Sequence, residues 1–403
     1  MKPKLRQVRS QPTVQDGQRG VLLSDPLRIS RNTIFVPASL ALLLALLDGT
    51  RDVGTLRTGF ELRTGTPLST SSIEQFISQL DGALYLENER FGAAYDSALN
   101  QYRSAASRPP ALAGSCYPAD ADEARAYLQQ FQEASPEDDY DPAGGIVGLV
   151  SPHIDFERGG HIYARVWAKA RLALEEADLA VILGTDHNEG EGRITLTRQD
   201  YETPWGTVPT ARDAVDEFLS EAGEGVFDCE LNHRWEHSIE TAVVWLHYLL
   251  GDKPCPVLPI LCGSFQSFIE GAKSPQQSGE IASTIDVLRR LVKRQRTIVV
   301  AAADLAHVGP VFGDPLPLDF VAHARLAKQD GQLLDIMSQG QADEFLAEIR
   351  KDGDRRHVCG VPPIYVTMSV LSGATGVSLG YAQCPASEDE TSVVSICGML
   401  YQS

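Results

Sequence analysis

The feature that most restricts the fold is a set of three hydrophobic runs rich in β-branched residues. Each run is followed at once by a polar segment with a histidine. The runs begin near residues 145, 180 and 297, and the polar segments carry His153, His187 and His307. Apolar runs of this length, separated by helical patterns, predict buried strands of an α/β sheet. Because ligands of such sheets bind outside the carboxyl ends of the strands, we expect the three segments to meet at one sheet edge.

Composition places the chain among cytoplasmic globular proteins. The formal charge of −19 over 403 residues argues against a general binder of nucleic acids or anionic membranes. Residues 1–20 are polar and basic without an apolar core, which is unlike a secretory signal, and the apolar stretch 40–47 is too short to span a bilayer. The seven cysteines are scattered without a Cys-x-x-Cys pair, so we expect them to be reduced.

The chain is predicted to have three parts. Residues 1–25 are expected to form a flexible tail, residues 26–105 a small, mainly helical, winged-helix-like domain, and residues 110–403 the α/β domain. The expected elements of the small domain are helices over 38–47, 53–62 and 71–80 and a short strand, or wing, over 83–86. In the large domain we expect helices over 122–132, 161–174, 214–221, 237–250, 278–293, 319–338 and 361–371 and terminal strands over 377–381 and 393–399.

The small domain is interpreted as a docking module. Its runs Leu-Leu-Asp-Gly-Thr-Arg and Gln-Leu-Asp-Gly-Ala-Leu-Tyr-Leu resemble the PqqD-like domains that bring peptide substrates to radical enzymes. DNA binding is the alternative for a winged helix. Because residues 26–105 are slightly acidic, they fit poorly with a surface that follows phosphates, and nucleic acid is the less favoured partner.

The first two polar segments predict metal ligands or general bases. Pro152 ends one strand before His153, and a neutral imidazole held there by rigid backbone suits either role. The alternative is a loop histidine that bonds a carbonyl. Metal-binding histidines usually pass their second N–H to a carboxylate or carbonyl, and Asp155 or Asp186 is placed to accept it.

Two further segments add titratable groups. Asp304 and His307 follow the third strand, where Asp304 serves either the site or, alternatively, as a helix N-cap. Glu236, His237 and Glu240 occupy the first turn of an amphipathic helix, where the helix dipole favours carboxylates. A capped, charged helix start is the alternative for this second segment.

Cys359 stands before a helix that opens with two prolines. A helix N-terminus favours a thiolate, and one cysteine with two histidines completes a three-ligand metal site that leaves a position open. A buried, inert cysteine is the alternative.

Seven segments, in this order, resemble the Memo family, whose prokaryotic members are called AmmeMemoRadiSam system protein B. The resemblance covers about residues 110–401, and this chain has Asp155 and Asp186 in segments where many members read Pro-His-Ala-Gly-Tyr and Ser-His-His. The segments are Ala-Gly-Ser-Cys-Tyr-Pro-Ala-Asp, Pro-His153-Ile-Asp, Leu-Gly-Thr-Asp-His187-Asn, Thr203-Pro204-Trp-Gly206, Glu236-His237-Ser-Ile-Glu240, Asp304-Leu-Ala-His307 and Cys359-Gly-x-x-Pro-Ile.

The resemblance implies a fold like that of the class III extradiol (LigB-type) dioxygenases, an α/β sandwich. It assigns His153, His187 and Cys359 to the metal site. It assigns His237, Asp304 and His307 to the surrounding pocket, where we expect catalytic roles, with Asp155, Asp186, Glu236 and Glu240 supporting the ligands.

Three functions remain open from the sequence. The first is a non-heme iron oxidoreductase, with copper as the alternative metal. The second is an adaptor that binds a metal or a phosphorylated peptide without turnover. The third, implied by the resemblance alone, joins these in one system with a radical SAM enzyme and an AMMECR1-like partner.

Overall fold

The computed structural model describes residues 2–135, 145–188, 191–252, 254–271 and 273–403. The chain forms two compact units, residues 1–104 and residues 105–403. In the described residues, none of the helices is both long and apolar enough to cross a lipid bilayer.

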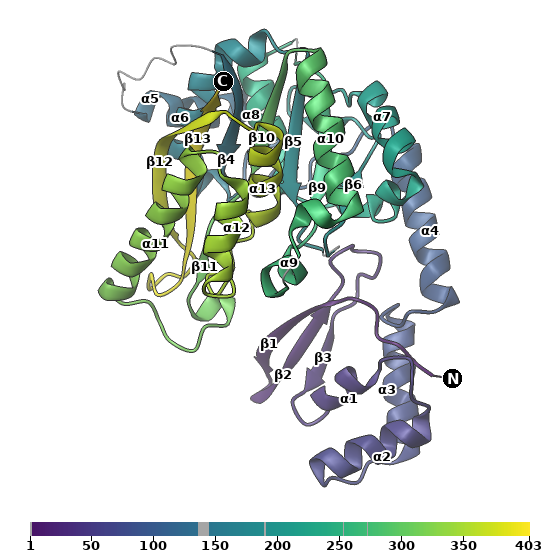
Figure 1. Cartoon of the computed structure of the whole chain (residues 1–403). Helices are drawn as coiled ribbons and strands as arrows, with labels where there is room; N and C mark the ends of the chain where they lie inside the picture. Colours follow the sequence, from purple (N-terminus) through teal and green to yellow (C-terminus); the bar gives the residue numbers. More distant parts are fainter. Residues whose placement is uncertain (1, 136–144, 189–190, 253, 272) are drawn as a thin grey trace. The chain divides into compact units, whose positions relative to one another are not determined.

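The first unit is a three-stranded antiparallel sheet followed by helices (Figure 1). Its helices begin and end with local signals: Asp52 caps α2 by accepting the amide of Thr55, and Gly65 ends that helix with a φ of 67°. Leu56, Phe60, Leu80 and other apolar side chains form its core. The elements are β1 (Arg9–Gln15), β2 (Gln18–Ser24), β3 (Ile34–Pro37), α1 (Ala41–Leu46), α2 (Val53–Thr64), α3 (Thr70–Gly82) and α4 (Glu89–Ser104).

Residues 9–24, which we expected in a flexible tail, instead form the β1–β2 hairpin. The register runs from Arg9↔Ser24 to Gln15↔Gln18, and the turn residues Asp16 and Gly17 have φ of 50° and 77°. Two positive φ angles at an Asp-Gly turn are the requirement of a tight hairpin, so the expectation of a tail was wrong. The mostly exposed β1 carries no apolar alternation that would have indicated a strand.

The expected strand over 83–86 is also absent from the described residues. Helix α3 runs to Gly82, Leu84 has a φ of 60°, and Leu86 makes only an isolated bridge to Leu5. The apolar side chains of Tyr85 and Leu86 are buried in the core of the unit. A short apolar run in a buried loop has the same sequence pattern as a buried strand, which explains the wrong prediction. The three predicted helices correspond to α1, α2 and α3, whereas α4 was not predicted.

The second unit is built on an eight-stranded mixed sheet of order β11-β13-β4-β10-β5-β9-β6, with β12 paired to β13. The four strands β4, β10, β5 and β9 are parallel, and the outer strands are antiparallel to their neighbours. The sheet strands are β4 (Ile146–Ser151), β5 (Leu179–Thr185), β6 (Ile194–Leu196), β9 (Val257–Cys262), β10 (Thr297–Ala302), β11 (His307–Val308), β12 (Thr375–Pro385) and β13 (Val393–Gln402). A separate hairpin joins β7 (Tyr201–Thr203) to β8 (Gly206–Val208).

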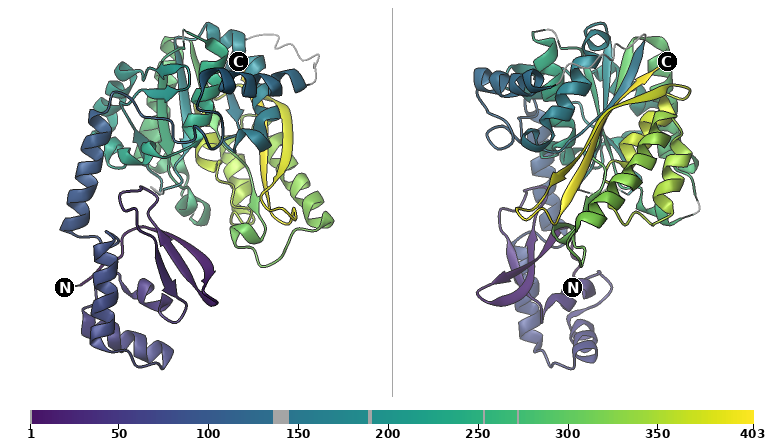
Figure 2. Two further views of the ribbon diagram at one scale, coloured as in Figure 1. Left: turned by 180° about the vertical axis from the view of Figure 1, so that it is seen from behind. Right: turned by 90° about the vertical axis from the view of Figure 1, so that its left-hand side faces the viewer.

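Helices cover both faces of this sheet, which confirms the predicted α/β class (Figure 2). One core joins the sheet to α5, α6 and α8, and the other joins it to α7, α10, α11, α12 and α13. The seven predicted helices are present, and α9 and α12 were not predicted. The helices are α5 (Ala121–Ala134), α6 (Phe156–Glu175), α7 (Arg212–Ala222), α8 (Ser238–Leu250), α9 (Gln266–Glu270), α10 (Gly279–Arg294), α11 (Phe320–Ser338), α12 (Ala342–Arg350) and α13 (Val361–Val370).

Candidate metal centre

The three polar segments meet at one sheet edge, as the sequence predicted. Strands β4, β10 and β5 are direct neighbours, and the segments with His153, His307 and His187 follow their respective carboxyl ends. Side chains from separate parts of the chain are thereby brought to one place.

His153 is fixed by the neighbouring strand β10. Its side chain is buried, its backbone N donates to Asp304 Oδ1 over 2.8 Å, and its Nδ1 lies 3.0 Å from Ala302 O. Because a carbonyl only accepts, Nδ1 carries the proton and Nε2 keeps its lone pair for the site. Burial, with the neighbouring histidines, holds the pKa of His153 well below its usual value, so the ring is neutral.

Glu236 orients the other two histidines. Its carboxylate is buried just before α8; Oε1 lies 3.0 Å from His187 Nδ1 and 3.1 Å from His237 Nδ1, and Oε2 accepts His187 N over 3.0 Å. Oε1 also accepts the amides of His237 and Ser238, at the start of α8. Although burial disfavours the charge, the two histidines hold the pKa of Glu236 well below its usual range.

The three imidazoles form a compact group. The ring centroids of His187 and His237 are 4.6 Å apart, and those of His153 lie 5.0 and 5.2 Å from them. One ring nitrogen from each lies within 4.8 Å of the others, a spacing that allows one metal ion to contact all three.

Cys359 joins this group from the loop before α13. Its Sγ lies 3.3 Å from His153 Nε2, and its carbonyl accepts from Thr185 Oγ1. A Cβ on Gly360 would lie 2.4 Å from Asp304 O, so only glycine lets this loop approach the end of β10 so closely. Burial raises the pKa of the Cys359 thiol.

Asp304 and His307 lie beside the group without capping a helix. Asp304 Oδ1 accepts the amides of His153 and Ile154, and Oδ2 is 3.6 Å from His153 Nε2, so the N-cap interpretation is wrong. Burial raises the pKa of Asp304. His307 Nδ1 lies 3.2 Å from Leu305 O, and burial lowers the pKa of His307 to about 4.

Of the four carboxylates expected to support the ligands, only Glu236 contacts histidine rings in the described residues. Glu236 contacts two histidines, and Asp186 precedes His187, where its carboxylate accepts from Asn232 Nδ2 and burial raises its pKa to about 6. In the described part of the chain, the recorded bonds of the other two carboxylates go to other groups. Asp155 caps α6 and pairs with Arg158, and Glu240 pairs with Arg108, so their expected supporting role is not borne out by these contacts.

Sequence reasoning missed Arg108, which lies between the two predicted domains. The residue is fully buried, and its guanidinium binds Glu240 and the carbonyls of His233 and Glu236. An arginine among small residues and prolines gives no local signal of burial, because its partner lies far along the chain.

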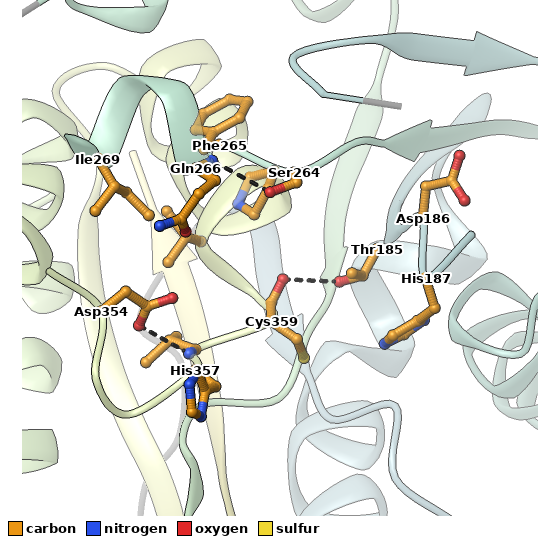
Figure 3. A pocket seen from close by; sticks show the side chains of 13 residues that line it. Thr185, Asp186, His187, Ser264, Phe265, Gln266, Ile269, Asp354, His357 and Cys359 are labelled. Carbon is orange, nitrogen blue, oxygen red and sulfur yellow. Dashed lines mark hydrogen bonds between the residues drawn. The ribbon is translucent and has the colours of Figure 1, made fainter. Parts of the chain in front are cut away.

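A cavity of about 250 Å³ opens beside the group (Figure 3). His187, Asp186 and Thr185 line one side and the loop of Cys359 another. Asp354 and His357, which sequence reasoning also missed, belong to that loop and have φ of 54° and 49°.

An α/β sandwich that gathers imidazoles, a thiol and carboxylates at the carboxyl edge of parallel strands defines a protein with a candidate transition-metal centre. The family model described as Memo-like protein matches residues 108–400, and the chain belongs to this family.

Curated relatives carry the same family name. A MEMO1 family protein of Aquifex aeolicus is 26% identical over 100% of both chains. One of Methanosarcina acetivorans is 27% identical over 73% of this chain and 99% of its own length, and one of Thermus thermophilus is 26% identical over 79% and 90%.

Proposed function

We propose that the chain binds one transition-metal ion through His153, His187 and Cys359, with His237 as a further donor. The proposal rests on one observation: nitrogen atoms from three imidazoles lie within 4.8 Å of one another, with a thiol sulfur 3.3 Å from one of them. Imidazole and thiolate together suit iron, copper or zinc better than magnesium or calcium. Iron is our first choice and copper the alternative, in keeping with the extradiol dioxygenase-like fold implied by the sequence.

The orientation of the two imidazole rings fits such an ion. His153 Nδ1 donates to a carbonyl and His187 Nδ1 contacts Glu236, so each ring directs its other nitrogen away from these partners. This pairing of histidine with a carbonyl or carboxylate is the usual arrangement around a bound metal. Burial of His153 also limits access of water to its ring.

A bound iron or copper ion would supply Lewis-acid and one-electron chemistry, and this chain's own residues would position and protonate the reactants. His307, whose pKa burial lowers to about 4, is neutral at pH 7 and offers the reactants an imidazole that can form hydrogen bonds. His237 Nδ1 lies 3.1 Å from Glu236, and this contact fixes the orientation of its ring beside the site. The proposed activity is therefore a non-heme metal-dependent oxidoreductase.

Metal analysis of anaerobically purified protein tests this proposal. We expect one equivalent of metal in the wild type and in the control His323→Ala, whose imidazole bonds Gln383 on the far strand β12. His187→Ala and Cys359→Ala should lose the metal while staying folded. Full metal retention in both variants would refute the ligand set. Metal binding without oxygen consumption, for any peptide tried, would favour the adaptor function.

A docking role for the first unit is a second proposal, favoured by its sheet. Strands β1 and β3 are the outer strands, and outer strands can pair with an extended peptide. This use fits the PqqD-like resemblance and a system with a radical SAM enzyme and an AMMECR1-like protein. We expect a radical SAM enzyme to co-purify from the native host with the full chain and not with a chain that begins at residue 105. Co-purification with both would place docking on the second unit. A salt-sensitive shift in the gel mobility of duplex DNA would instead support a regulator that binds DNA through the first unit.

A further inference from the structure

The cavity beside the metal centre has walls of two kinds. Phe265, Ile269 and Val361 form a buried apolar wall. The rest of the lining includes two acidic residues, Asp186 and Asp354. None of the thirteen lining residues, all in the described part of the chain, is lysine or arginine. Figure 3 shows Asp354 and His187 on opposite sides, with Cys359 between them.

The negative charge remains when the proposed metal is counted. Cys359 as thiolate with the carboxylates of Glu236, Asp186 and Asp354 gives four negative charges against two positive charges of a divalent ion. The nearby Arg356 does not balance this excess, since it is buried in a pair with Asp330 and a second contact with Asp352.

Asp354 has an acceptor left for a ligand. Its Oδ1 accepts Val358 N over 2.9 Å, which fixes the loop, and no described side chain forms an ion pair with it. Burial raises the pKa of Asp354, although the amide of Val358 and the nearby His357 and Arg356 favour its charged form. A cationic group of a ligand would favour the charged form further.

We propose that this cavity takes a small primary amine with an apolar body, whose ammonium group faces Asp354 while its other end reaches the metal. The inference rests on the proposed metal centre. The apolar wall accommodates the body, and the acidic lining selects against carboxylates and phosphates. A phosphorylated peptide, the ligand of the adaptor hypothesis, is therefore disfavoured at this cavity.

The test uses the full chain loaded with Co²⁺ at pH 8 and three thiols of equal chain length: aminobutanethiol, neutral butanethiol and mercaptobutanoate. Binding is followed by the visible absorption of the cobalt. Aminobutanethiol should bind about tenfold more tightly than butanethiol, as expected for one hydrogen-bonded charge. Mercaptobutanoate should bind more weakly than butanethiol.

The variant Asp354→Asn isolates the charge. Asparagine keeps an oxygen for Val358 N and tolerates the positive φ of 54°, so the loop is retained. We expect the preference for the amine to disappear in Asp354→Asn and to persist in Asp286→Asn, a matched change at an exposed site of α10. Equal affinities for the three thiols, no binding of any of them, or the same preference in Asp354→Asn would overturn the inference alone. Failure of Co²⁺ to bind at all would instead refute the metal centre and, with it, this inference.

Discussion

Replacement of Arg108 by methionine should destabilise the second unit strongly. The fully buried guanidinium lies 2.7 Å from Glu240 through Nη1 and donates to the carbonyls of His233 and Glu236, each over 2.6 Å. Glu240 accepts three further hydrogen bonds, from Ala111 N, Leu112 N and Tyr117 Oη. The pair therefore joins the start of the unit to the residues that carry Glu236.

The magnitude follows from what the substitution leaves behind. Arg108→Met leaves the charge of Glu240 buried and two carbonyls without their donor, and removing one partner of a buried ion pair costs about 3–5 kcal/mol. The double variant with Glu240→Gln should lose less free energy of unfolding than Arg108→Met alone, because no uncompensated charge stays in the core.

Tryptophan fluorescence during urea unfolding measures this loss. All four tryptophans (Trp167, Trp205, Trp235 and Trp245) belong to the second unit, so the signal reports that unit alone. Arg6→Met, which breaks the buried pair with Asp25 in the first unit, serves as the control and should leave the tryptophan transition unchanged. A loss of less than about 1 kcal/mol in Arg108→Met would refute the reasoning, since it would lie within the range of exposed pairs.

Three further predictions concern the site and its surroundings. The free energy of unfolding should fall as the pH drops from 6.5 towards 3. Burial lowers the pKa of His233 to about 3 in the folded state, so over this range the unfolded chain binds a proton at His233 and the folded chain does not. In His233→Gln, urea unfolding at several pH values should show a slope smaller by about 1.4 kcal/mol per pH unit; an unchanged slope would contradict the assignment. Glu236→Gln should weaken Co²⁺ binding about 10–100-fold in a chelator competition, whereas Asp155→Asn should not; equal losses would return Asp155 to the metal site. Gly360→Ala should displace Cys359 and abolish the cobalt–thiolate absorption. If the variant instead has the spectrum of the wild type, the loop can move to accommodate the added Cβ.

Local sequence patterns correctly predicted most of the strands and helices of the second unit. Apolar runs identified β4, β5 and β10, and the polar segments after them identified His153, His187 and His307 as neighbours before any contact was known. In the first unit the same approach failed for β1, whose side chains are mostly exposed. The Asp16-Gly17 turn was the available signal, because such turns favour hairpins.

The sequence by itself determined the α/β class, the family resemblance and the gathering of histidines at one sheet edge. These follow from periodicity and from the rule that parallel strands present their carboxyl ends together. Only the tertiary structure decided which carboxylates support the histidines. Glu236 and Glu240 are four residues apart at the start of α8, yet the first contacts His187 and the second Arg108. Packing between distant segments decides where each side chain points and which partner it contacts. Local sequence does not encode that packing.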